Sequence, residues 1–182
     1  FLQNEWKNDR WGILIGGRLD KHNMVDNVIF SPRANLRFNP TQNINLRLSY
    51  SSGFRAPQAF DEDMHIENVG GTVAMIERAK NLKEEKSQSF SASADMYHRF
   101  GVFQTNFLIE GFYTRLTDVF VLGEPYDRGD GILVKTRSNG PGAKVMGLTL
   151  EGKVAYLSIL QIQAGLTLQR SRYDEPHKWH DD

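Results

Sequence analysis

The chain has 182 residues, of which 22 are basic and 22 acidic, so its formal net charge is zero and nothing in the overall charge favours a nucleic-acid partner. It contains no cysteine, which excludes disulfide scaffolds, thiolate zinc sites and thiol nucleophiles. Aromatic residues make up 11% of the chain and prolines are few, a composition that favours strands joined by polar turns over an α/β fold.

Hydropathy excludes one kind of membrane protein and leaves another open. No segment approaches the roughly 20 consecutive apolar residues that a membrane helix needs. The mean hydropathy of −0.48 is similar to that of a soluble protein. A membrane β-barrel has a similar average, because its strands alternate lipid-facing and lumen-facing residues.

Apolar and polar side chains alternate with a period of two along eight segments, which predicts eight strands. These segments are 1–6, 11–20, 32–38, 44–51, 89–96, 103–113, 132–155 and 160–173. We expect the sixth to continue as far as Leu122 and the seventh to be kinked at Asn139–Gly142.

The connections between these strands alternate between short and long. Alternation stops from Arg55 to about Lys86, a stretch too long for a hairpin turn, and residues 73–80 within it leave room for a short helix. Outer-membrane barrels have short turns on one rim and long external loops on the other, whereas a soluble sandwich has no reason to follow this rule. The pattern has no visible beginning or end, which indicates a piece of a larger sheet.

The alternation alone does not say whether the apolar face meets lipid or a protein core. Strands of about ten residues or more, the unequal rims and polar faces rich in Arg, Gln, Asn and Glu favour lipid. Aromatic residues at strand ends fit interfacial girdles, or simple core and turn packing. They are Trp6, Trp11, Phe38, Tyr50, Phe103 and Tyr156.

Residues 31–63, SPRANLRFNPTQNINLRLSYSSGFRAPQAFDED, resemble the mid-barrel signature of TonB-dependent outer-membrane receptors. Residues 81–87, NLKEEKS, are similar to the family's Asn-Leu-Lys-Pro-Glu-Lys-Ser segment, with Glu84 in place of proline. Residues 111–119 and 138–151 resemble two later strands of the same barrels. The resemblance therefore spans nearly the whole chain in the family's order.

The resemblance implies an all-β fold: an antiparallel up-and-down meander of about eight strands, part of a 22-stranded transmembrane β-barrel whose lumen is plugged. Residues 1–182 would then be a partial TonB-dependent receptor β-barrel, without the plug and without the N-terminal and C-terminal strands. The unpaired edges of such a piece predict self-association.

The resemblance also implies a function in the bacterial outer membrane. Such a receptor captures and imports a scarce nutrient, such as an iron chelate (siderophore), haem or cobalamin. Its implied partners are the TonB energy-transducing complex, which acts through the plug, outer-membrane lipid and the small-molecule nutrient or metal chelate. It is not an enzyme, and neither a cofactor nor a nucleic acid is implied.

Candidate ligand-binding residues lie in the two longest polar connections, where external loops would capture the nutrient. They are Arg55, Gln58, Asp61, Glu62, Asp63, His65 and Glu67, followed by Tyr126, Asp127, Arg128 and Asp130. The first loop has oxygen and imidazole groups that could bind a metal, but their spacing matches no metal motif and favours a solvated acidic loop. Arg33, Arg37 and Arg47 could form a basic lumen wall, or pair with lumen carboxylates or the plug.

Two other classes of protein fit parts of the pattern. A passive porin or adhesin barrel would share the unequal rims and need no plug. A soluble ligand-binding β-sandwich would share the alternation. Catalysis has no support, because no nucleophile elbow is present and the spacing of His and Ser is generic.

Overall fold

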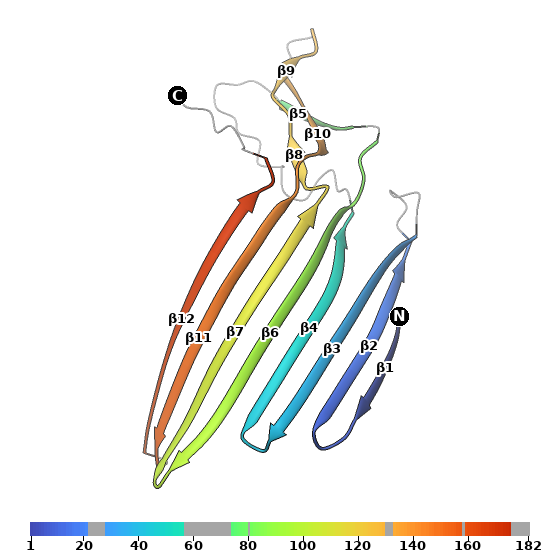
Figure 1. Cartoon of the computed structure of the whole chain (residues 1–182). Helices are drawn as coiled ribbons and strands as arrows, with labels where there is room; N and C mark the ends of the chain where they lie inside the picture. The colour runs from blue at the N-terminus through green and yellow to red at the C-terminus, as the bar shows by residue number, and fades with distance from the viewer. Residues whose placement is uncertain (22–27, 57–73, 80, 130–132, 158, 176–182) are drawn as a thin grey trace.

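A computed structural model describes residues 1–21, 28–56, 74–79, 81–129, 133–157 and 159–175, and these form an all-β structure (Figure 1). Eight long strands make one antiparallel sheet in the order β1-β2-β3-β4-β6-β7-β11-β12. The strands are β1 (Leu2–Lys7), β2 (Trp11–Asp20), β3 (Ile29–Thr41), β4 (Ile44–Arg55), β6 (Glu85–Phe100), β7 (Phe103–Thr117), β11 (Ala143–Tyr156) and β12 (Leu160–Tyr173). The predicted eight-stranded meander is therefore confirmed.

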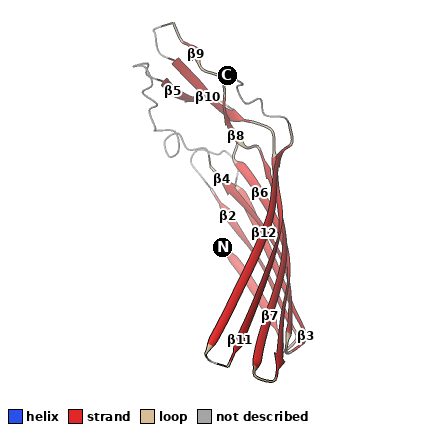
Figure 2. Ribbon diagram, turned by 90° about the vertical axis from the view of Figure 1, so that its left-hand side faces the viewer, coloured by secondary structure: helices blue, strands red, loops and turns tan. Residues whose placement is uncertain are grey.

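Short turns close one end of this sheet and long connections leave the other end, as the sequence predicted (Figure 1). Seen from the side, the eight strands form one curved layer (Figure 2). Within the described residues the sheet stays open, because β1 and β12 are its two edges and do not pair with each other.

A second, smaller sheet lies beyond the long-connection end and was not predicted (Figures 1 and 2). Its strands are β5 (Ala74–Arg78), β8 (Phe120–Leu122), β9 (Tyr126–Asp127) and β10 (Leu133–Asn139). The central strand β10 pairs in parallel with β5 and antiparallel with β8 and β9. The connection between β4 and β6 is thus joined to the connection between β7 and β11.

The small sheet overturns three local predictions. The expected short helix over residues 73–80 is wrong, because residues 74–78 form β5 and pair with a strand much later in the chain. The sixth strand does not continue to Leu122: β7 ends at Thr117, and Asp118 adopts a left-handed backbone with φ 54°, a conformation that interrupts a strand. The predicted kinked seventh strand is two strands, since β10 and β11 belong to different sheets.

The register places apolar side chains in continuous rows across the large sheet. One such row is Trp6, Ile13, Leu36, Leu48, Ala92, Gly111, Leu148 and Leu168. Because side chains alternate between faces, the rows two residues away share this face, which we call the apolar face. None of the described elements covers it: Leu46 is 37% exposed and Leu48 is 55% exposed.

Aromatic pairs lie towards both ends of the apolar face. Near the short turns the rings of Trp11 and Phe38 stack with centroids 4.1 Å apart, and those of Phe103 and Tyr156 lie 5.1 Å apart. Towards the long connections the ring of Tyr50 lies 4.8 Å from that of Phe90. The two zones match the expected interfacial girdles better than the packing of a protein core, because no described element covers this face.

Among the described residues, burial is concentrated at the long-connection end of the large sheet and in the small sheet. Val134 in β10 is fully buried, and Ile29 and Ala56 at the long-connection end of the large sheet are nearly so. No helix in the described part of the chain is long and apolar enough to cross a membrane. The large sheet therefore has almost no buried core among the described residues and is held mainly by backbone pairing.

Gly147 tests how closely neighbouring strands pack. A Cβ at this position would lie 2.5 Å from the Phe112 ring and 2.7 Å from the Leu168 carbonyl oxygen, so Gly147→Ala should lower the free energy of unfolding by about 1–3 kcal/mol. In the same strand, a Cβ at Gly152 meets nothing within 4 Å, so Gly152→Ala should be neutral or slightly stabilising. Urea unfolding of both variants is the measurement, and equal midpoints would contradict the argument.

Candidate functional site

Glu85 connects three segments at the long-connection end of the sheet. It is the first residue of β6, and its Oε2 accepts hydrogen bonds from the Phe120 backbone N–H at 3.1 Å and from the Arg55 guanidinium at 3.2 Å. The Arg55 guanidinium also lies 5.2 Å from the centroid of the Phe120 ring, a favourable cation–π distance. The carboxylate therefore fixes the end of β4 and the start of β8 against β6.

Asn139 makes a second connection with its side-chain amide. Its Oδ1 accepts from the Lys83 backbone N–H at 2.7 Å, while its Nδ2 donates to the carbonyls of Lys83 at 3.0 Å and Asp118 at 2.8 Å. Both ends of the amide are needed, because the site presents one donor and two acceptors. Asn139 thus joins the end of β10 to the segments that precede β6 and follow β7.

Glu84, which lies between Lys83 and Glu85 in the chain, is buried. Its carboxylate forms an ion pair with Lys86 at 3.0 Å. Burial by itself raises the pKa of Glu84, but its backbone hydrogen bond and the Lys86 ammonium outweigh burial, and the pKa falls below its ordinary value. The side chain is therefore charged at neutral pH.

The candidate loop residues fall into two groups. Arg55 lies in the junction with Glu85, and Tyr126 and Asp127 form β9 at the outer edge of the small sheet. Asp127 Oδ1 accepts from the Gly129 backbone N–H at 2.8 Å, and Arg128 lies 3.6 Å from Glu77. The others lie outside the described residues: Gln58, Asp61, Glu62, Asp63, His65, Glu67 and Asp130.

The face opposite the apolar face carries the three arginines predicted to line a lumen, and we call it the polar face. Arg37 and Arg47 lie directly opposite each other in β3 and β4. The described contacts of Arg33 and Arg47 are with neutral groups: Arg33 contacts Gln3 and lies 4.6 Å from the Phe1 ring, and Arg47 donates to Asn45 Oδ1 at 2.7 Å. Arg37 and Arg47 thus place two positive charges side by side, while Glu110 lies in the same row two strands from Arg47.

Further along the polar face, side-chain hydrogen bonds cross between strands. Ser89 and Thr114 hydroxyls lie 3.0 Å apart, Thr149 and Thr167 hydroxyls lie 3.1 Å apart, and Gln163 donates to Glu151 at 2.6 Å. No group of three or more metal-binding side chains occurs within the described residues. The polar face is therefore suited to water and polar solutes.

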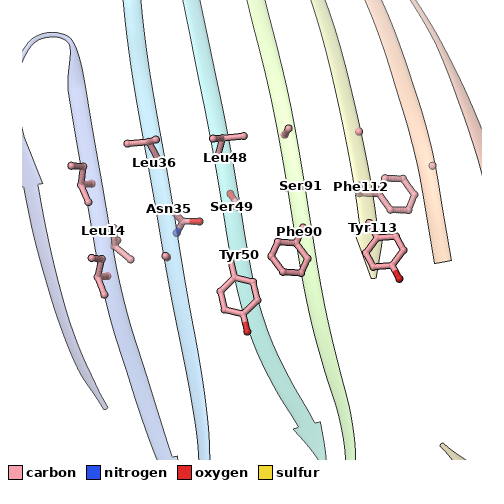
Figure 3. Close-up of a pocket in the computed structure, with 16 residues that line it drawn as sticks. Leu14, Asn35, Leu36, Leu48, Ser49, Tyr50, Phe90, Ser91, Phe112 and Tyr113 are labelled. Atoms are coloured by element: carbon pink, nitrogen blue, oxygen red, sulfur yellow. The ribbon is translucent and has the colours of Figure 1, made fainter. Parts of the chain in front are cut away.

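The apolar face contains an open hollow of about 770 Å³ (Figure 3). Figure 3 shows Leu36, Leu48, Tyr50, Phe90 and Tyr113 along neighbouring strands. Its walls offer aliphatic and aromatic carbon and few polar groups, so it does not have the mixture of polar and apolar groups typical of a specific small-molecule site. We interpret it as part of the surface made for hydrocarbon.

The family model described as "TonB dependent receptor-like, beta-barrel" matches residues 1–181. The chain belongs to this family of β-barrels, which confirms the predicted relationship. Among curated proteins, no sequence matches the chain closely enough to count as a relative.

Solved structures share the fold at low sequence identity. The siderophore receptor PirA from Pseudomonas aeruginosa has a TM-score of 0.76 at 18% identity, over 94% of this chain and 34% of PirA. The FrpB iron transporter from Neisseria meningitidis (F5-1 variant) has a TM-score of 0.70 at 18% identity, over 94% of this chain and 25% of FrpB. The alcaligin outer-membrane receptor FauA from Bordetella pertussis has a TM-score of 0.56 at 18% identity, over 96% of this chain and 30% of FauA. The chain thus spans about a quarter to a third of these proteins.

Sequence reasoning missed Glu85, Asn139 and Phe120 as the residues that organise the loop end. Glu85 lies in the segment 81–87 and Asn139 in the segment 138–151, both of which resemble the family's motifs. Those motifs were the available signal, but nothing in them indicated that one contacts the other across the fold.

Asn139→Asp should destabilise the loop end. The carboxylate cannot donate to the carbonyls of Lys83 and Asp118, so we expect a loss of about 1–3 kcal/mol in the free energy of unfolding. Urea unfolding in lipid bilayers and hydrogen exchange at the Lys83 amide are the measurements. Asn43→Asp, in the short turn between β3 and β4, makes the same chemical change as a control, and an equal loss there would refute the specific role of Asn139.

Proposed function

We propose that this chain is part of an outer-membrane receptor that captures a scarce nutrient outside the cell and imports it with energy delivered through TonB. The nutrient class that we favour is an iron chelate, with haem and cobalamin as the other candidates. The residues 1–182 supply part of the barrel wall and two of its external connections, while a plug and further strands belong to the rest of the receptor.

The exposed apolar face is the observation that carries this proposal. Leu48 and its neighbours in the seven other strands form a broad exposed hydrophobic surface. A soluble protein rarely leaves so large an apolar surface in contact with water. A lipid bilayer removes this contact with water, because the apolar side chains then lie against hydrocarbon while the strands pair their backbone groups within the sheet. The family match and the siderophore and iron receptors of similar fold support the same conclusion.

The opposite face and the small sheet support capture and passage of a polar ligand. Arg37 and Arg47 place two positive charges side by side on the wall that faces the lumen, where they suit anionic chelates. On the outer side, β9 holds Tyr126 and Asp127 on the edge of the small sheet, next to Arg128. Such loops are the first part of the receptor that a ligand meets from outside.

The direct test is uptake by a strain that lacks the gene, with and without the intact gene restored. Cells receive one radiolabelled probe at a time: individual ferric siderophores, haem or cobalamin. We expect the gene to restore uptake of one probe class and a TonB deletion to abolish it. Uptake that persists without TonB would favour the passive porin, and restoration of none of the probes would contradict the nutrient assignment.

Asp127→Asn combined with Arg128→Gln tests the contribution of β9 and its neighbour to capture. The asparagine keeps an acceptor for the Gly129 N–H, so the turn is preserved while two charges are lost. If these side chains contact the ligand, affinity for the transported probe should fall about tenfold, as expected for a loss of about 1.4 kcal/mol. Asp9→Asn with Arg10→Gln, in the short turn at the other rim, is the matched control, and equal affinity of the two double variants would exclude this contact.

A further inference from the structure

The apolar face changes character over its last rows before the long connections. Tyr50, Phe90, Tyr113 and Met146 lie in register across β4, β6, β7 and β11, and Figure 3 shows the first three along neighbouring strands. Tyrosine is common at membrane interfaces because its ring is apolar and its hydroxyl is polar. This row therefore marks the level at which hydrocarbon gives way to headgroups.

Three basic side chains lie side by side in the next row of the same face. Arg115, Lys144 and Arg172 lie in register on the adjacent strands β7, β11 and β12, and Arg170 follows Met146 in the row below. Adjacent strands are about 4.8 Å apart, so three cations fall within about 10 Å of one another. We call these four residues, together with Lys86 at the start of β6, the basic rim.

The rest of the same level lacks positive charge. Leu2, Gly17 and Pro32 lie in register on β1, β2 and β3, and Ser52 pairs with Gln88 where β4 meets β6. The basic rim is therefore a local concentration of charge on one half of the sheet. If these charges served only to keep the sheet soluble, we would expect them along the whole row and not on one half of the sheet.

Acidic groups neutralise only part of the basic rim. Lys144 forms an ion pair with Asp174 at 2.5 Å, and Lys86 pairs with Glu84 at 3.0 Å. The hydrogen bond from Lys144 holds the pKa of Asp174 below its ordinary value, and the charge of Arg115 adds to this effect. Arg115 is exposed although β7 is an inner strand of the sheet, so it can still meet an external anion.

We propose that the basic rim binds the phosphate groups of a lipid in the outer leaflet of the outer membrane. This inference rests on the proposed function, which places the long connections outside the cell. An arginine guanidinium can donate two parallel hydrogen bonds to a phosphate, and each cation near an anionic membrane surface adds to the attraction. The occupant has both a phosphate head and acyl chains, because the basic rim continues directly into the aromatic row and the aliphatic rows below it.

Charge argues against the other occupant that this face could take. A second copy of the chain that packed through the basic rim about a two-fold axis would bring this patch against itself, and like charges brought together in this way repel. A lipid phosphate instead supplies the missing negative charge.

The test titrates the purified full-length receptor in detergent with lipid A as the phosphorylated lipid. Lipid A stripped of its phosphates and inorganic phosphate are the comparison probes, and native mass spectrometry reports bound lipid. Arg115→Gln, Lys144→Gln and Arg172→Gln are combined in one variant. We expect affinity for lipid A to fall about fivefold for each cation removed.

The matched control removes the same charge at the opposite rim through Lys7→Gln, Arg10→Gln and Arg99→Gln, and it should bind lipid A as the parent does. If the triple variant does not fold, Arg172→Gln alone is compared with Arg172→Lys, which keeps the charge and should retain binding. Equal affinity of the triple variant and its control would overturn the proposal. So would equal affinity for phosphate-free lipid A, or binding of inorganic phosphate as tight as that of lipid A.

Nutrient uptake by the same variants separates this inference from the proposed function. Loss of lipid A binding with uptake intact is the expected result for the triple variant. A parent receptor that binds lipid A and imports no nutrient would overturn the proposed function and leave the lipid site standing.

Discussion

The antiparallel hydrogen-bond ladder is the constraint on which the rest of this structure depends. Each of the six inner strands of the large sheet pairs with a neighbour on both sides, so its backbone polar groups find partners without any covering layer. The same ladder fixes the register, and the register decides which side chains share a face. A slip of one residue in β4 would exchange Leu48 with Ser49 and place polar groups on the apolar face. Pairing therefore determines the two surfaces as well as the fold.

The long-connection end is organised differently, by side chains that contact backbone groups. Glu85 and Asn139 each connect segments that are distant in the sequence, and together they tie β4, β6, β8 and β10 into one junction. Their bonds are directional, so they position the small sheet more specifically than apolar packing alone would. The large sheet is held by a continuous backbone ladder. The small sheet is joined to it by a few side-chain hydrogen bonds, those of Glu85 and Asn139.

Much of the large sheet could be predicted from the sequence, because a period of two in hydropathy is a local signal. The alternation along Ile44 to Tyr50 indicated both the strand and its apolar face. The small sheet could not be predicted in this way, because β5 is five residues long and is stabilised by a parallel partner far along the chain. The break after Thr117 depends on the backbone of a single residue, Asp118, and hydropathy carries no information about it. For the candidate site, the two predicted connections do meet in the small sheet, but Glu85 and Asn139 act through tertiary contacts that spacing does not reveal.

The parallel pairing of β5 with β10 also has a consequence for the order of assembly and for movement. β5 must wait for its partner until β6 and β7 have been made, whereas each hairpin of the large sheet joins consecutive segments. The pairing of β5 with β10 thus closes a long-range contact around β6 and β7, before β11 and β12 follow in the chain. Because β5 and β10 are joined by backbone hydrogen bonds, the connection between β4 and β6 and the connection between β7 and β11 are mechanically coupled. A displacement of one connection therefore moves the other with it.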